Sequence, residues 1–145
     1  MNAICVKKLS PNAKLPTYGS LEAAGADLYA CIDEAVTIQP GETVMIPTGI
    51  ALEVPKGCAG LIYARSSMGT KRGLAPANKV GVIDSDYRGE IRVVLLNHGK
   101  TVQVVEPYER VAQLLITPVL TPKYIEVEEL TDTDRGSGGF GSTGK

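Results

Sequence analysis

Residues 81–90 read GVIDSDYRGE and form the most informative stretch of the chain. A short apolar run precedes Asp84, and Gly89 ends the polar segment before a second apolar run at residues 91–96. Two β-prone runs joined by a short polar segment with glycine are typical of a β-hairpin. The pattern therefore predicts a hairpin with the Asp84 carboxylate at its tip, where a rigid turn can hold the acid beside a ligand.

The same acids resemble the start of an EF-hand calcium loop, because Asp84 and Asp86 are two residues apart. That loop needs an oxygen ligand at its fifth position and a glutamate at its twelfth. Here those positions are Arg88 and Leu95, so the pattern excludes an EF-hand.

The composition indicates one β-rich domain. The chain has 145 residues and is 43% hydrophobic, but it has no tryptophan and one phenylalanine, so aliphatic residues must fill the interior. Its 16 glycines and 9 prolines favour many short strands over long helices.

Charge, hydropathy and cysteine usage exclude several classes of protein. The formal net charge of −1 provides no basic field for nucleic acid, and no apolar run approaches the roughly 20 residues of a membrane span. The N-terminus lacks a secretion signal, and the three cysteines form no C-x-x-C pair. We therefore expect a cytoplasmic protein with reduced thiols that binds neither nucleic acid nor membranes.

Turn-forming residues recur every eight to fifteen positions, with short β-prone runs between them. Only residues 66–70 favour a helical turn. Regular short strands predict an all-β protein, either a β-sandwich or a β-barrel. The expected strands are residues 3–9, 35–38, 43–46, 50–54, 59–63, 91–96, 102–105, 111–117 and 123–127.

The composition changes near residue 131, where a glycine-rich end begins. We expect a β domain over residues 1–131 and a flexible C-terminal arm over 132–145. The arm is either a disordered terminus or, given Arg135 and Phe140, a segment that folds over a ligand with a charge at one end and a ring at the other. Its G-x-x-x-x-G-K spacing lacks the following helix of an ATP-binding loop.

Five segments, in order, resemble the five motifs of the homotrimeric dUTPase family. Small departures include Ser67, where many members have glycine, and Ala64, where many have proline. The segments are residues 24–30 (AGADLYA), 64–69 (ARSSMG), 78–90 (ending in GVIDSDYRGE), 109–114 (ERVAQL) and 135–144 (RGSGGFGSTG).

The resemblance implies a jelly-roll-like β fold and hydrolysis of dUTP to dUMP and diphosphate. That activity keeps uracil out of DNA and supplies dUMP for thymidylate synthesis. The resemblance also implies a homotrimer in which each active site takes residues from more than one subunit.

The third motif carries the implied catalytic and nucleoside-binding residues. Asp84 resembles the general base that orients a water for attack on the α-phosphorus, although an isolated acid here could also simply form a turn. Tyr87 resembles the residue whose ring packs on the deoxyribose and excludes a 2′-hydroxyl; alone, it could be a core or edge tyrosine. Asn78, which could instead cap a loop, and the backbone of Gly81, Val82, Ile83 and Asp84 are expected to bind uracil.

The second and fourth motifs carry the implied phosphate ligands. Arg65 offers a planar fork to phosphate oxygens, and Ser66 and Ser67 add hydroxyl donors. Gln113 resembles the family's phosphate-contacting glutamine. Arg92 stands where some relatives have a ligand-side residue, but an exposed strand charge is the alternative.

The last motif is expected to complete the site from the arm. Phe140, with Gly141 beside it, would stack on uracil while Arg135 binds the γ-phosphate. Closure of such an arm would exclude water from the phosphates.

A magnesium ion suits this chain better than zinc. His98 is the only histidine, and no His/Cys cluster is present in the sequence. Mg²⁺ would be held mostly by the triphosphate and water, with Asp27 in its second shell or organising the site. Asp27 could also be an acid at the start of a strand, and Arg110 could tie strands together by ion pairs.

Two other classes of protein share features with this chain. A dCTP deaminase shares the fold, but it needs a glutamate at the base site, and the third motif has no convincing candidate. A non-catalytic β-sandwich would have no reason to combine Asp84, Tyr87, Arg65 and Phe140.

Overall fold

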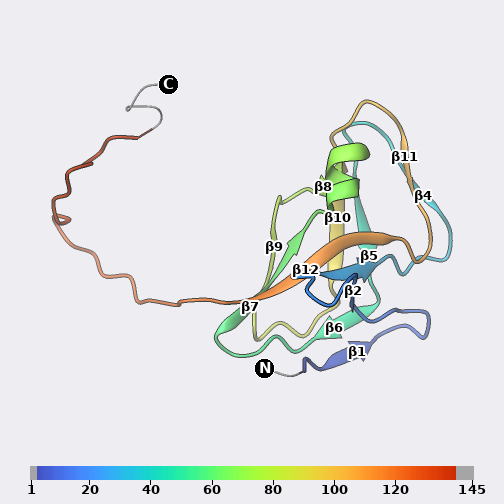
Figure 1. The fold of residues 1–145 in the computed structure, drawn as a ribbon, viewed down its shortest axis with the longest axis horizontal. Helices are drawn as coiled ribbons and strands as arrows, with labels where there is room; N and C mark the ends of the chain where they lie inside the picture. The colour runs from blue at the N-terminus through green and yellow to red at the C-terminus, as the bar shows by residue number, and fades with distance from the viewer. Residues whose placement is uncertain (1–2, 140–145) are drawn as a thin grey trace.

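The computed structural model describes residues 3–139, and almost all of its regular structure is β (Figure 1). This confirms the all-β prediction and the helical turn expected near residues 66–70. The elements are β1 (Val6–Lys8), β2 (Thr17–Tyr18), β3 (Ala26–Tyr29), β4 (Val36–Ile38), β5 (Thr43–Pro47), β6 (Ile50–Leu52), β7 (Cys58–Tyr63), the π-helical turn η1 (Ser67–Lys71), β8 (Leu74–Pro76), β9 (Gly81–Ile83), β10 (Arg92–Asn97), β11 (Gln103–Val105) and β12 (Arg110–Pro118).

In the described part of the chain, residues 3–139, the strands form four antiparallel sheets. The largest has the order β2-β3-β12-β7-β9, the next β5-β10-β8, and β1-β6 and β11-β4 are two-stranded. Within residues 3–139 none of these sheets closes on itself, so the barrel alternative was wrong.

An aliphatic core fills the space between the two larger sheets. Leu28 of β3 and Val111 of β12 come from one sheet, and Ile46 of β5 and Leu95 of β10 from the other; all four are fully buried. Alternate residues of β10 point inward, which is the period of two expected for a strand with one buried face. Met68 of η1 joins this core and anchors the helical turn to it.

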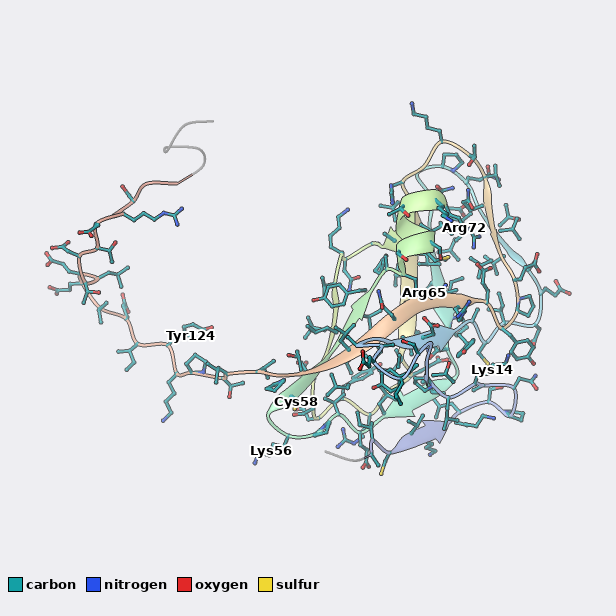
Figure 2. All side chains as sticks on the ribbon, viewed as in Figure 1. Lys14, Lys56, Cys58, Arg65, Arg72 and Tyr124 are labelled. Carbon is teal, nitrogen blue, oxygen red and sulfur yellow. The ribbon has the colours of Figure 1, made fainter. Side chains whose placement is uncertain are left out.

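Eight of the nine expected strand runs contain a strand, with ends that differ by a few residues. Residues 123–127 form no strand, although Ile125-Glu126-Val127-Glu128 alternates as a strand does. A strand needs a neighbour to accept its backbone hydrogen bonds, and these residues lie exposed, away from the body; Figure 2 shows Tyr124 there. The expected runs do not include β2, β3 or β8, and β9 was expected only as the first arm of the hairpin at Asp84.

The hairpin predicted around Asp84 was wrong. β9 pairs with β7, whereas β10 pairs with β5 and β8 in another sheet. Buried Ile91 holds the chain against the segment before β6 and the start of β6. Its N–H donates to Ile50 O over 2.8 Å, and its carbonyl accepts from the Thr48 hydroxyl over 2.6 Å. Residues 84–91 therefore connect two sheets.

The chain leaves the body after β12 (Figure 1). Val119 N–H still donates to Gly57 O over 2.9 Å, and residues 119–137 are exposed. The composition change near residue 131 thus lies inside this extended segment. Within residues 3–139, no helix is both long and apolar enough to cross a membrane.

Candidate active site

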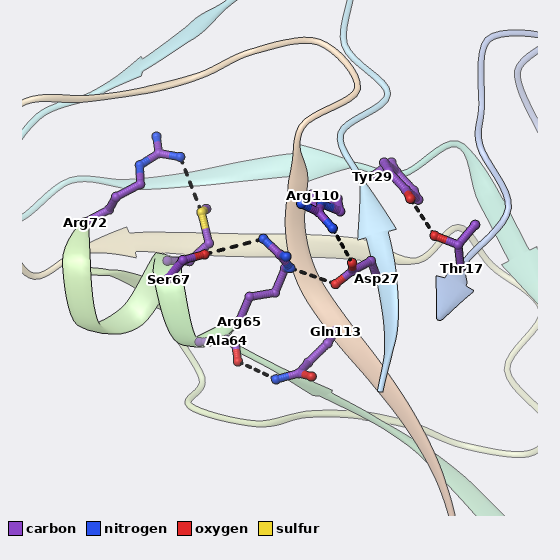
Figure 3. Close-up of polar contacts among 10 residues, drawn as sticks. Thr17, Asp27, Tyr29, Ala64, Arg65, Ser67, Arg72, Arg110 and Gln113 are labelled. Atoms are coloured by element: carbon purple, nitrogen blue, oxygen red, sulfur yellow. Dashed lines mark hydrogen bonds and ion pairs between the residues drawn. The ribbon is translucent and has the colours of Figure 1, made fainter. Parts of the chain in front are cut away.

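An ion-paired group of side chains lies where β3, β12 and the end of β7 meet (Figure 3). Asp27 of β3 accepts from Arg65 Nε over 2.7 Å and from Arg110 Nη1 over 3.2 Å. The sheet brings these residues together, because Asp27 pairs in register with Gln113 of β12, and Gln113 with Tyr63 of β7.

Asp27 organises this group. Its side chain is only 11% exposed, and each carboxylate oxygen accepts from a different arginine. A carboxylate this buried needs such partners, because an unpaired buried charge is strongly destabilising. The contacts fix where the guanidinium groups of Arg65 and Arg110 lie.

Hydroxyl groups stand beside Arg65 on η1. Ser66 precedes the helical turn, is exposed and makes no side-chain cap bond, and the Ser67 hydroxyl lies 3.5 Å from Arg65 Nη1. A guanidinium fork with neighbouring hydroxyl donors suits phosphate oxygens.

Gln113 of β12 also belongs to this group. Its Nε2 donates to Ala64 O over 2.9 Å, immediately before Arg65 (Figure 3). Gly25 lies against the same side chain, where a methyl group would be 2.5 Å from Oε1. Gly25 lies within the first motif, but its packing role is not visible in the sequence, because it depends on the cross-strand register.

A second group lines a hollow of about 420 Å³ formed by Val82, Ile83, Asp84, Tyr87, Gly89, Glu90 and Arg92. Tyr87 Oη donates to Glu90 O over 3.0 Å, which folds the ring back across Gly89. Asp84 is exposed at this hollow.

Glu90, another residue that sequence reasoning did not single out, holds this second group in place. Its carboxylate accepts from Gly49 N over 3.0 Å and from Arg92 Nε over 2.9 Å. Arg92 is thus exposed and ion-paired on its strand. Glu90 lies at the end of the quoted stretch, but its partner Gly49 is 41 residues away, so no local signal identified it.

Asn78 lies at the opposite end of β9 from Asp84. Its Nδ2 is 3.6 Å from where a Gly81 Cβ would be, so the amide lies over the start of β9. The neighbouring Lys79 has φ +66°, the left-handed conformation of a tight turn.

The two groups lie at opposite ends of β7. Gly81 pairs with Ile62 and Ile83 with Gly60, so the chain reaches Asp84 near the start of β7, whereas Arg65 follows its end. Six residues of extended chain separate these points, a distance of roughly 20 Å at about 3.3 Å per residue. One copy of the chain therefore does not bring Asp84 and Arg65 together.

The arm contributes no contact to either group within residues 3–139. Arg135 Nε donates to Gly138 O over 2.8 Å in a local turn. Phe140 and Gly141 lie outside the described residues.

The fold is all-β, with an arginine-and-hydroxyl group at one end of β7 and a hollow that holds Asp84 at the other, an arrangement suited to a phosphorylated ligand. The family model for dUTPase matches residues 11–144. The chain belongs to the dUTPase family, and its fold is the family's jelly roll.

Several relatives cover nearly all of the chain. The deoxyuridine 5′-triphosphate nucleotidohydrolase of Burkholderia cenocepacia is 50% identical over 132 residues, 90% of this chain and 89% of its own. The protein of that name from Desulfitobacterium hafniense is 48% identical over 149 residues, 99% of each chain.

Solved structures of dUTPases are similar to this chain in fold. A mutant Staphylococcus bacteriophage 80alpha dUTPase with dUpNHpp matches with a TM-score of 0.90 and 30% identity, covering all of both chains. A mutant dUTPase from phage phi11 of S. aureus, described with a structural Mg(II) ion, matches with a TM-score of 0.81 and 26% identity over 90% of this chain and 100% of its own.

Proposed function

We propose that this protein hydrolyses dUTP to dUMP and diphosphate, which limits uracil incorporation into DNA and supplies dUMP for thymidylate synthesis. Membership of the dUTPase family over nearly the whole chain supports this activity. The observation that carries the proposal is the arrangement of the motif residues in two formed groups, one cationic with hydroxyls and one acidic beside a hollow.

The cationic group binds the phosphates. Arg65, Ser66, Ser67 and Gln113 supply donors for phosphate oxygens, and Asp27 keeps Arg65 in place between substrates. Triphosphate oxygens compete with Asp27 for the Arg65 guanidinium, and charge-assisted bonds to phosphate are strong enough to share it.

The nucleoside binds along β9, from Asn78 before its start to the hollow at its end. Asn78 and the backbone from Gly81 to Asp84 pair with uracil; a cytosine would leave polar groups unpaired at about 1–3 kcal/mol each. Tyr87, held by its bond to Glu90 O, packs on the deoxyribose and excludes a 2′-hydroxyl. Arg92 lies at the ligand side of the same hollow.

Asp84 acts as the general base. Its carboxylate accepts a proton from a water and orients that water for in-line attack on the α-phosphorus, and the diphosphate leaves on the opposite side. No covalent intermediate is needed.

Each complete site takes residues from more than one copy in a homotrimer. The support is the separation of roughly 20 Å between Asp84 and Arg65 along β7 within one chain. A second copy can bring its acidic hollow to the cationic group of the first.

The three free cysteines suit the reducing cytoplasm.

The C-terminal arm, over residues 132–145, acts as a lid. Arg135 binds the γ-phosphate, and Phe140 with Gly141 covers the uracil. A triphosphate nucleotide is the ligand that satisfies both ends of the lid, so closure selects for dUTP and excludes water.

The donors of this chain fit a magnesium ion that is bound mainly by its substrate. Within residues 3–139 no group of three His, Cys, Asp or Glu residues could enclose a metal, and both Asp27 oxygens already pair with arginines. When bound to the triphosphate, Mg²⁺ would neutralise phosphate charge, with Asp27 reaching it only through water.

The test is a release assay on dUTP, dCTP and UTP with wild type and Asp84→Asn. We expect wild type to release diphosphate from dUTP alone, and Asp84→Asn to bind dUTP but turn it over at least about a hundredfold more slowly. Ammonia release from dCTP would support the deaminase instead, and unchanged turnover by Asp84→Asn would remove Asp84 from its role.

A further inference from the structure

Two arginines flank the helical turn η1, and each ties it to the five-stranded sheet. Arg65, before the turn, pairs with Asp27. Arg72, after the turn, pairs with Glu109, which directly precedes β12. Because Arg110 follows Glu109 and also pairs with Asp27, the two ion pairs hold both ends of η1 against the same part of the sheet.

Arg72 has more partners than a typical surface arginine. Its Nε donates to Gln103 Oε1 over 3.0 Å, its Nη2 to Val104 O, and its Nη1 reaches both Glu109 and Met68 Sδ. The Arg72 side chain is 28% exposed and that of Glu109 is 22% exposed. Partly buried, multiply bonded guanidinium groups lose little entropy per bond and hold their geometry.

Glu109 connects Arg72 to the start of β12. Its other carboxylate oxygen accepts from Glu106 N over 2.9 Å, and its carbonyl accepts from Ala30 N over 2.8 Å at the end of β3. One residue separates Glu109 from β12 position 111, where burial begins. The Arg72–Glu109 pair therefore fixes η1 relative to the strand that carries Gln113.

The helical turn η1 needs this support, because five residues of helix are not stable alone. Substrate would disturb the other pair, since phosphate oxygens compete with Asp27 for Arg65. Arg72 makes its bonds on the far side of the turn, to Gln103, Val104 and Glu109, so it keeps them while Arg65 turns to the phosphates.

We propose that Arg72 is a positioning residue for the triphosphate: through Glu109 it holds η1 so that Arg65, Ser66 and Ser67 meet the β- and γ-phosphates in one geometry. The inference rests on the proposed dUTP hydrolysis and adds a residue outside the motif positions expected to touch substrate.

The test compares two ligands by calorimetry in wild type and variants: dUMP, which lacks the β- and γ-phosphates, and a non-hydrolysable imido analogue of dUTP. We expect Arg72→Gln to weaken analogue binding roughly tenfold, the size of coupling between neighbouring groups, with dUMP binding unchanged. Arg72→Lys, which keeps the charge but not the fork, should recover only part of the loss.

Lys71→Gln is the matched control, because it removes an exposed positive charge from the same turn. Lys71→Gln should weaken binding of the analogue clearly less than Arg72→Gln does. Glu109→Gln should also weaken analogue binding with dUMP binding unchanged, and the double variant should be no worse than Arg72→Gln, because the Arg72–Glu109 pair is already lost in that single variant. If Arg72→Gln does not fold, Glu109→Gln carries the same comparison.

The inference is overturned if Arg72→Gln binds the analogue as tightly as wild type. It is equally overturned if both ligands weaken together with a lowered Tm, because that result indicates a general structural role. A wild-type protein that neither binds the analogue nor releases diphosphate would instead overturn the proposed function.

Discussion

Gly25 packs against Gln113, and a methyl group at Gly25 would lie 2.5 Å from Gln113 Oε1. Gly25→Ala should push Gln113 away from Ala64 O and lower kcat/KM for dUTP by about ten- to a hundredfold, the effect of misplacing a substrate-positioning group. Steady-state diphosphate release measures it. Gly19→Ala, at a site with open space, is the control and should match wild type.

Gly89 permits Tyr87 to fold back, because a Cβ at Gly89 would collide with the Tyr87 hydroxyl and ring. Gly89→Ala should displace the ring and relax the preference for dUTP over UTP by roughly tenfold, within the 1–3 kcal/mol that one pocket contact supplies. The measurement is the ratio of kcat/KM values for the two nucleotides. An unchanged ratio would contradict the sugar-excluding role of Tyr87.

The separation of Asp84 and Arg65 predicts complementation between inactive variants. Arg65→Gln and Asp84→Asn, refolded together in equal amounts, should recover about a quarter of wild-type activity if random assembly joins intact groups from different copies. Arg65→Gln mixed with Asp27→Asn is the control, because both defects fall in the group supplied by one copy. No recovery in mixed oligomers of normal size would argue against shared sites.

Asn97 is a buried polar support of the fold. Its Nδ2 donates to Ile38 O and Thr101 O over 2.9 Å each, and its Oδ1 accepts from Gly99 N over 3.0 Å. Asn97→Ala leaves these three backbone groups without a hydrogen-bond partner and should lower the free energy of unfolding by about 2–4 kcal/mol. Urea unfolding at one protein concentration tests this. Exposed Asn12→Ala should stay within about 0.5 kcal/mol of wild type.

The extended C-terminal segment is expected to serve catalysis and not the stability of the body. Deleting the residues after Thr133 should leave oligomeric state and Tm unchanged, because the Arg135 bond and the Gly136 N bond to Thr133 O are local. Turnover should fall on the order of a hundredfold, since the phosphates are no longer held and covered. Near-normal turnover of the truncated protein would refute the lid.

Strand character was readable from sequence, whereas strand pairing was not. The runs at β5, β10 and β12 are rich in β-prone residues, which their own sequences show, whereas the alternation of buried and exposed positions in β10 comes from the sheet that it joins. The hairpin at Asp84 failed because buried Ile91 bonds to Ile50, 41 residues away, and takes the chain into another sheet. Residues 123–127 failed for the converse reason, since within residues 3–139 their alternation meets no partner strand.

The sequence by itself determined the family, the aliphatic all-β fold and the identity of the motif residues, because residue types and their order along the chain carry that information. Only the tertiary structure decided that Asp27 is committed to Arg65 and Arg110, that Arg72 and Glu109 hold η1, and that Asp84 lies a strand's length from Arg65. These relationships join residues up to 83 positions apart, and they arise from cross-strand register and burial, which no local pattern specifies.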